Sequence, residues 1–125
     1  MKLSMLMTVN AMVAVVFGVA MVLVPGQFVS LYGVEEIAAL NYIAQLLGAA
    51  FVFQAVLAWS ARNAAESDAR RAIVLALFIG NAFGFVLALI GQLGNVVGAL
   101  GWSTVALYLL FGLGYGYFQF VKPAV

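Results

Sequence analysis

Residues 72–121, AIVLALFIGNAFGFVLALIGQLGNVVGALGWSTVALYLLFGLGYGYFQFV, form a run of 50 residues without a single charge. A membrane-spanning α-helix needs about 20 consecutive apolar residues, so this run is long enough for two spans with a turn between them. The glycines and the asparagine within residues 94–101 mark the turn. We therefore predict spans at about 72–92 and 102–121.

Upstream of this run, charged residues bound two more apolar stretches, at 3–34 and 37–61. The first stretch holds one span at about 5–24, because Pro25-Gly26 is a strong helix terminator. The second stretch holds one span at about 37–59. All four segments are apolar on every face and lack the alternation of membrane β-strands, which excludes a transmembrane barrel.

Residues at the predicted helix starts support these assignments. Glu35 and Glu36 precede the second span, where carboxylates favour a helix N-terminus. Ser67 or Asp68 is expected to cap the third span. The predicted fold class is therefore all-α, a single domain over residues 1–125 that forms an integral membrane four-helix transmembrane bundle.

The composition leads to the same class. Of 125 residues, 67% are hydrophobic and 7% are charged, whereas soluble domains carry about 25% charged residues. So few charges exclude a soluble monomer, and the high hydrophobicity excludes a disordered chain. Cysteine and histidine are both absent, which excludes disulfides, thiol nucleophiles, Cys/His zinc sites and imidazole bases.

The distribution of charge predicts the orientation. With four spans, all of the cations fall on one side of the membrane, and the positive-inside rule makes that side cytoplasmic. These cations are Lys2, Arg62, Arg70, Arg71 and Lys122. We expect a multi-pass protein of the bacterial inner (plasma) membrane with both termini in the cytoplasm (N-in/C-in). The first apolar stretch also fits a cleaved signal peptide, although it is longer than usual and lacks a clear cleavage site.

Small residues at helical spacing predict close helix packing, because helices in lipid associate through van der Waals contact. Shorter versions of the pattern occur at Ala14 and Gly18, and at Ala44 and Gly48. The longest, here called the small-residue stripe, comprises Ala72, Ala76, Gly80, Gly84 and Ala88. It indicates either packing inside a four-helix bundle or a homodimer contact.

The polar residues inside the spans are amides and hydroxyls rather than ionisable acids or bases, which argues against an ion pump or a proton-coupled carrier. Asn10 and Gln54 lie at similar depth, so we expect them to pair. The remaining polar and aromatic side chains indicate either hydrogen bonds between helices or a ligand pocket between the first three helices. The candidate ligand-binding residues are Asn41, Gln45, Asn81, Tyr108 and Tyr115.

A pattern of Gly, a small residue and two aromatics recurs at 32-residue intervals, beginning at Gly48, Gly80 and Gly112. Two interpretations stay open. Short repeats of this kind indicate duplicated spans, but membrane helices also reuse Gly, Ala and Phe independently.

Four segments resemble a family of small four-span bacterial inner-membrane proteins, a domain of unknown function. They are LYGVE at 31–35, QLLGA at 45–49, SDARRAI at 67–73 and GWSTVALY at 101–108. The resemblance implies a four-helix inner-membrane fold and carries no activity with it.

The function predicted from these features is non-catalytic. We expect an accessory or structural subunit of a larger membrane assembly, or a homo-oligomer, whose partners are the lipid bilayer and other membrane chains rather than nucleic acid. The alternative is a binder or carrier of a small neutral or hydrophobic ligand within the bundle. An enzyme would have to rely on serine, tyrosine or amide chemistry, or on Glu35 and Glu36 at the outer surface, which diverge by about 100° on a helix and converge poorly. No catalytic residue, metal site or cofactor is expected.

Overall fold

The computed structural model describes residues 2–121 and is helical over most of that range. The helices are α1 (Leu3–Leu23), α2 (Pro25–Leu31), α3 (Ala38–Ala61), α4 (Asp68–Leu93) and α5 (Gly101–Gly116), which a π-helical turn, η1 (Tyr117–Val121), extends. Four segments are long and apolar enough to cross a membrane: α1, α3, α4, and α5 together with η1. The all-helical fold with four candidate spans is therefore confirmed.

The helix boundaries differ from the predicted ones at two places. Helix α4 begins at Asp68 rather than near residue 72, and Ser67 caps it by accepting a hydrogen bond from the Arg70 amide at 3.1 Å. The segment expected to be a loop after the first span contains the short helix α2. Pro25 occupies its first turn, where proline has no hydrogen-bonded amide to lose and is favoured.

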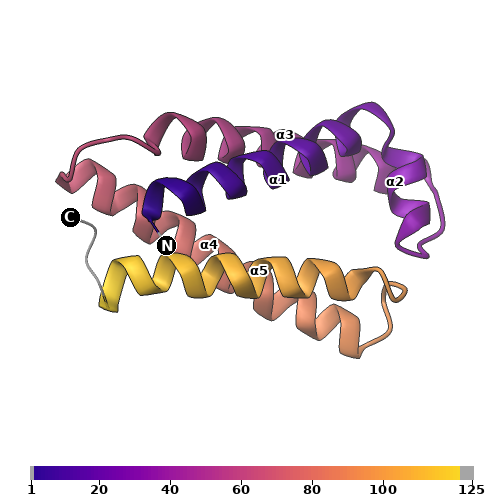
Figure 1. Cartoon of the computed structure of the whole chain (residues 1–125). Coiled ribbons are helices and arrows are strands. Elements are labelled where there is room, and N and C mark those ends of the chain that lie inside the picture. The colour runs from indigo at the N-terminus through magenta and orange to yellow at the C-terminus, as the bar shows by residue number, and fades with distance from the viewer. Residues whose placement is uncertain (1, 122–125) are drawn as a thin grey trace.

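The spans associate as two pairs. Helix α1 packs along α3, and α4 packs along α5, so that Figure 1 shows one pair above the other. A Cβ atom built on Gly18 would lie 2.8 Å from the Gly48 carbonyl oxygen, and one built on Gly48 would lie 2.8 Å from the Gly18 oxygen. Ala14 and Ala44 are buried next to this crossing. The small residues of the first two spans therefore bring two backbones into contact, as their spacing indicates.

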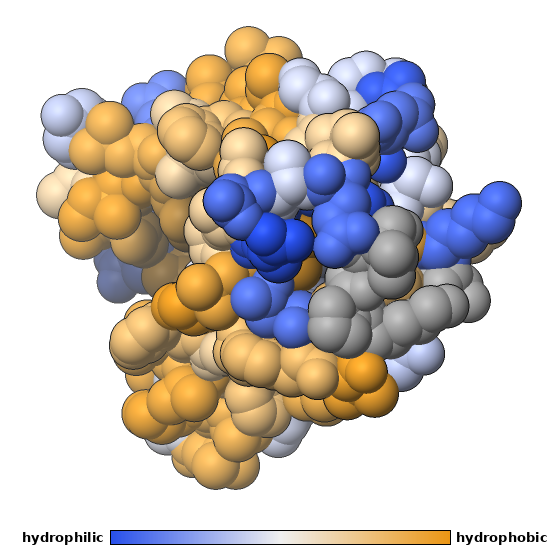
Figure 2. Space-filling view, turned by 90° about the vertical axis from the view of Figure 1, so that its left-hand side faces the viewer, coloured by the Kyte–Doolittle hydropathy of each residue, from blue (hydrophilic) through white to orange (hydrophobic). Residues whose placement is uncertain are grey.

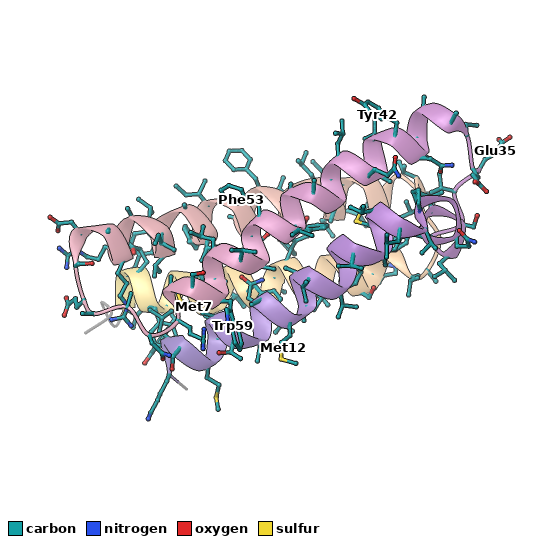
Figure 3. The ribbon with its side chains drawn as sticks, turned by 90° about the horizontal axis from the view of Figure 1, so that it is seen from above. Met7, Met12, Glu35, Tyr42, Phe53 and Trp59 are labelled. Atoms are coloured by element: carbon teal, nitrogen blue, oxygen red, sulfur yellow. The ribbon has the colours of Figure 1, made fainter. Side chains whose placement is uncertain are left out.

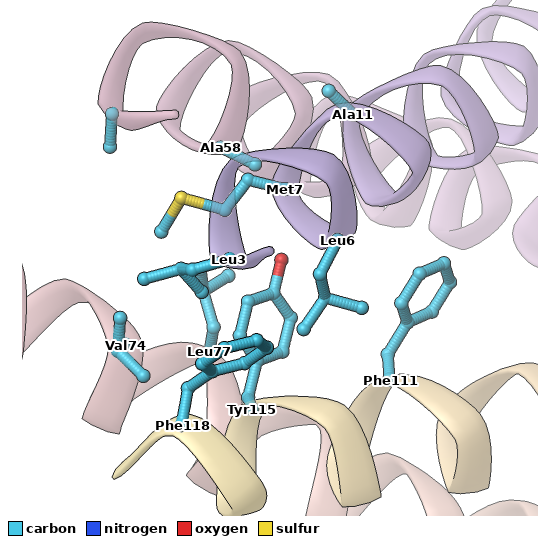
Figure 4. Close-up of a cluster of buried hydrophobic side chains, with 11 residues drawn as sticks. Leu3, Leu6, Met7, Ala11, Ala58, Val74, Leu77, Phe111, Tyr115 and Phe118 are labelled. Atoms are coloured by element: carbon cyan, nitrogen blue, oxygen red, sulfur yellow. The ribbon is translucent and has the colours of Figure 1, made fainter. Parts of the chain in front are cut away.

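The two pairs meet in a hydrophobic core at the end of the bundle that contains the start of α1 (Figure 4). Its fully buried members include Met7, Val74 and Tyr115. The other core residues are Leu3, Leu6, Ala11, Ala58, Ala61, Leu77, Phe111 and Phe118. Large apolar side chains also cover the outside of the bundle, and Figure 3 shows Phe53, which is 68% exposed, pointing away from it. Such a surface suits lipid rather than water.

Polar side chains gather at the end of the bundle near the start of α1, as the blue atoms in Figure 2 show. Arg71, near the start of α4, pairs with Glu66 of the preceding loop at 3.3 Å and with Asp68 of its own helix. The guanidinium of Arg62 lies 3.6 Å from the centre of the Trp59 ring. This end therefore has the cations and the interfacial aromatic ring of a membrane–water boundary.

The small-residue stripe packs within the chain along only part of its length. Tyr108 of α5 lies against Gly84, where it would clash with a Cβ atom, and Ala88 is half-buried. By contrast, Ala72, Ala76 and Gly80 are exposed, and a Cβ atom on Gly80 would meet nothing within 4 Å. Within the chain, the stripe therefore makes close contact through Gly84 and leaves the half nearer the start of α4 uncovered, so both interpretations of it stay open.

The crossing of α1 and α3 predicts a specific sensitivity. Gly48→Leu forces the added side chain into backbone and side-chain atoms of α1, so we expect a loss of about 1–3 kcal/mol in unfolding free energy. Gly91→Leu is the matched control, since a Cβ atom at Gly91 meets nothing within 4 Å. Reversible unfolding in mixed micelles measures both, and equal stabilities of the two variants would contradict the close crossing.

Candidate functional site

A cavity of about 170 Å³ lies between the two helix pairs, in the half of the bundle that also contains α2. Its walls are mainly aliphatic and aromatic, with a few amides and hydroxyls. The lining residues are Asn10, Val13, Ala14, Phe17, Met21, Phe28, Tyr32, Leu47, Phe51, Gln54, Asn81, Thr104, Leu107, Tyr108 and Phe111. An apolar pocket with a few converging polar groups is the usual form of a small-molecule site.

A layer of hydrogen bonds separates this cavity from the hydrophobic core. The side-chain oxygen of Asn10 accepts from the Tyr115 hydroxyl at 2.7 Å and from the Gln54 amide at 3.3 Å. Asn10 is 2% exposed and Tyr115 is fully buried. The predicted Asn10–Gln54 pair is thus confirmed, and Tyr115 joins it from α5. None of these bonds uses the amide N–H donors of Asn10.

Helix α2 covers the other end of the cavity with aromatic side chains. Tyr32 stacks on Phe28 at 5.3 Å between ring centres, and Phe28 meets Phe17 edge to face at 5.8 Å. The Tyr32 hydroxyl lies 2.5 Å from the hydroxyl of Thr104 on α5. The Tyr32 carbonyl also accepts from the Gly98 amide at 2.6 Å, which ties α2 to the loop after α4. The cavity is therefore closed at this end by contacts from both helix pairs.

Asn81 presents a polar atom to the cavity near the middle of α4. Its amide donates to the Leu77 carbonyl one turn earlier at 2.7 Å. Within residues 2–121 no donor reaches the oxygen of the same carboxamide, although the side chain lines the cavity and is only 3% exposed. This oxygen is not among the fully buried atoms that lack a partner, so it keeps some accessible surface. A ligand with a hydrogen-bond donor would satisfy this oxygen.

Next to the cavity, between α3 and α4, lies a second hollow of about 340 Å³, here called the lateral groove. The two spaces share the wall residues Leu47, Phe51, Gln54, Asn81 and Tyr108. The rest of the lateral groove is formed by Ala50, Phe53, Leu57, Ala76, Leu77 and Gly80. The candidate site therefore has an opening on the side of the bundle.

The structure brings only some of the five predicted ligand-binding residues to this site. Asn81 and Tyr108 line the cavity, and Tyr115 lies beneath it in the hydrogen-bonded layer. Asn41 and Gln45 are absent from the lining. The Asn41 amide donates to Glu36 at 3.0 Å, and the Gln45 amide donates to the Val22 carbonyl at 3.1 Å. These two amides fix the start of α3 instead.

The pocket expected between the first three spans has walls from all three of them, but it is not limited to them. Helix α5 supplies four of the lining residues, Thr104, Leu107, Tyr108 and Phe111, because the cavity lies between the helix pairs rather than within one. Phe28 of α2 and Tyr32, the residue after it, also line the cavity and were not predicted as site residues. Their apolar character in a connecting segment was the available signal, since a solvated loop would not need two aromatic rings.

The cavity offers hydrogen-bonding groups and apolar surface. Its lining contains amides, hydroxyls and apolar groups but no charged side chain. Across residues 2–121 no group of three or more His, Cys, Asp or Glu side chains is placed to hold a metal ion. A charged ligand would have no counter-ion in a membrane interior, so the site suits a neutral molecule.

Comparison with known protein families, with characterised proteins and with solved structures finds no match to this chain. The resemblance to four-span inner-membrane proteins therefore stays a prediction.

The polar layer predicts a measurable contribution from one hydroxyl. Tyr115→Phe removes the 2.7 Å bond to Asn10 and leaves the ring in place, so we expect a loss of about 0.6–1.7 kcal/mol in unfolding free energy. Tyr117→Phe, on the exposed side of the same helical segment, is the control and should have no effect. An unchanged stability for Tyr115→Phe would argue against the hydrogen bond.

Proposed function

We propose that this protein binds a small, neutral and largely apolar molecule in the cavity between its helix pairs. The observation that carries the proposal is Asn81, a nearly buried residue of the cavity wall whose side-chain oxygen accepts no hydrogen bond among the described residues. Ligand binding was the alternative predicted from the sequence, beside a purely structural role. The cavity and its position are the reason to prefer it.

The surroundings of the cavity support binding rather than passage through the membrane. The hydrophobic core and the Asn10 layer close it on one side, and α2 closes it on the other. A molecule in the cavity is thus held between these two ends of the bundle, and the adjoining lateral groove offers it a route to the lipid. Binding of this kind needs no ion gradient. The absence of charged residues at positions 72–121, which include the last two spans, agrees with this.

A second candidate function is the accessory subunit or homo-oligomer. The exposed small residues Ala72, Ala76 and Gly80 on α4 favour it, because small residues let a partner helix approach closely in lipid. On this account the partner is another membrane chain or a second copy. An assembly that persists in native membranes and dissociates in Gly80→Leu would support it.

We also propose the orientation that the charges indicate, with the end that carries Lys2, Arg62 and Arg71 in the bacterial cytoplasm. Short loops follow the positive-inside rule. The opposite end carries Glu35 and Glu36 and no lysine or arginine in the segments 25–36 and 94–101. The protein would thus be a multi-pass inner-membrane protein with both termini inside.

The absence of cysteine from the sequence makes this orientation directly testable. A single cysteine replacing Asn63, in the loop between α3 and α4, should resist a membrane-impermeant maleimide in intact cells. A single cysteine replacing Val96, in the loop between α4 and α5, should react. The reverse labelling pattern would contradict the proposed orientation, and lysed cells provide the control in which both sites react.

The proposed binding function is tested by native mass spectrometry of the protein released gently from its own membrane. We expect a discrete non-protein mass on the wild type. Asn81→Leu should reduce its occupancy by roughly tenfold, because one lost hydrogen bond in the cavity is worth about 1–3 kcal/mol. Asn41→Leu is the control, since Asn41 lies outside the cavity. An adduct that Asn81→Leu leaves unchanged, or no adduct at all, would count against the function.

A further inference from the structure

The opening of the cavity faces the lipid side of the bundle. Helices α3 and α4 follow each other in the chain, yet they scarcely approach one another beyond their connection, and Figure 1 shows them diverging. Exposed Phe53 lies on the α3 wall of the lateral groove, and exposed Gly80 lies on the α4 wall. In a membrane, this opening meets the acyl-chain region, because both residues are near the middle of their helices.

The size of the cavity limits what it encloses. A dry, apolar cavity of about 150 Å³ in another protein holds benzene, and the cavity here is only slightly larger, at about 170 Å³. A ligand with more than a small polar group and a short apolar segment must extend beyond it. The lateral groove, about 340 Å³, adjoins the cavity at five shared wall residues and is the nearest space into which it can extend.

The volume of the lateral groove suits an alkyl chain better than a protein helix. A helix with its side chains is about 10 Å across and rises about 5.4 Å per turn. A hollow of about 340 Å³ therefore holds less than one turn of such a helix. An extended alkyl chain is much thinner, and the walls at Ala76 and Gly80 are small enough to let it pass.

We propose that the ligand is a single-chain neutral lipid whose polar group hydrogen-bonds Asn81 and whose chain leaves the bundle through the lateral groove. This proposal rests on the proposed binding function and adds the ligand class and its route. The Asn81 oxygen accepts from a hydroxyl of the lipid, and the unused N–H donors of Asn10 face an acceptor such as an ester carbonyl. A charged headgroup is excluded because no ionised side chain lines either space.

Two monoacylglycerols test the proposal, 1-octanoylglycerol and 1-palmitoylglycerol, which share one headgroup and differ in chain length. Each is titrated by native mass spectrometry into the full-length, delipidated protein. The variant is Gly80→Leu, which places a side chain in the open space of the lateral groove. It disturbs no packing contact, because a Cβ atom at position 80 has no neighbour within 4 Å. Gly91→Leu is the matched control, because Gly91 is also free of neighbours, lies on the same helix and does not line either space.

We expect Gly80→Leu to weaken binding of the palmitoyl probe by roughly tenfold or more. Binding of the octanoyl probe should weaken clearly less, because fewer of its carbons have to pass the obstruction. Gly91→Leu should bind both probes as the wild type does. Comparing variants with the same probe removes the effect of partitioning into the micelle, and Ala76→Leu provides a second obstruction in the same groove.

Three results would overturn the inference. Equal effects of Gly80→Leu on both chain lengths would mean that the chain takes another route, and the proposed function would stand. Loss of a bound polypeptide from Gly80→Leu, with palmitoyl binding unchanged, would assign the lateral groove to a partner helix. If neither probe binds the wild type, the neutral lipid is rejected as the ligand. If the native protein also carries no adduct, the proposed binding function is rejected as well.

Discussion

The oxygen of Asn10 is the point at which three of the four spans are joined. It accepts hydrogen bonds from Tyr115 on α5 and from Gln54 on α3, and it belongs to α1. A buried amide in a membrane interior needs such partners, because no water is present to replace them. The bonds fix how the α1–α3 pair lies against the α4–α5 pair, and they do so at the boundary between a filled half of the bundle and a hollow one.

The hollow half follows from how the pairs are built. Within each pair, small residues allow close contact, as at the crossing of Gly18 and Gly48. Between the pairs, large side chains fill the space only on the Tyr115 side of the polar layer. On the other side the pairs separate, α2 covers the end, and the gap between α3 and α4 stays open. The cavity is therefore a consequence of pairwise packing, not of a missing side chain.

The number and approximate positions of the spans could be predicted from the sequence because they depend on local hydrophobicity and on charges at the helix ends. Ser67 as a cap and the Asn10–Gln54 pair were also predictable, since each rests on position along a helix. These features require no knowledge of which helices are neighbours.

The remaining features depend on tertiary packing. The pairing of α1 with α3 and of α4 with α5 brings Tyr115 within hydrogen-bonding distance of Asn10. The side chain of Asn41 bonds to Glu36 and does not line the pocket. The small-residue stripe looks uniform in the sequence, yet Tyr108 covers Gly84 and leaves Gly80 open. Helix α2 was missed because seven residues between a proline and a glycine give no periodic signal.

The most direct test of this account is a structure of the protein in nanodiscs of its native lipids, obtained by electron cryomicroscopy with a bound antibody fragment as a marker. The account predicts an elongated non-protein density that begins beside Asn81 and leaves the bundle between α3 and α4. Direct contact between α3 and α4 across Ala76 and Gly80, with side chains filling the cavity, would contradict it.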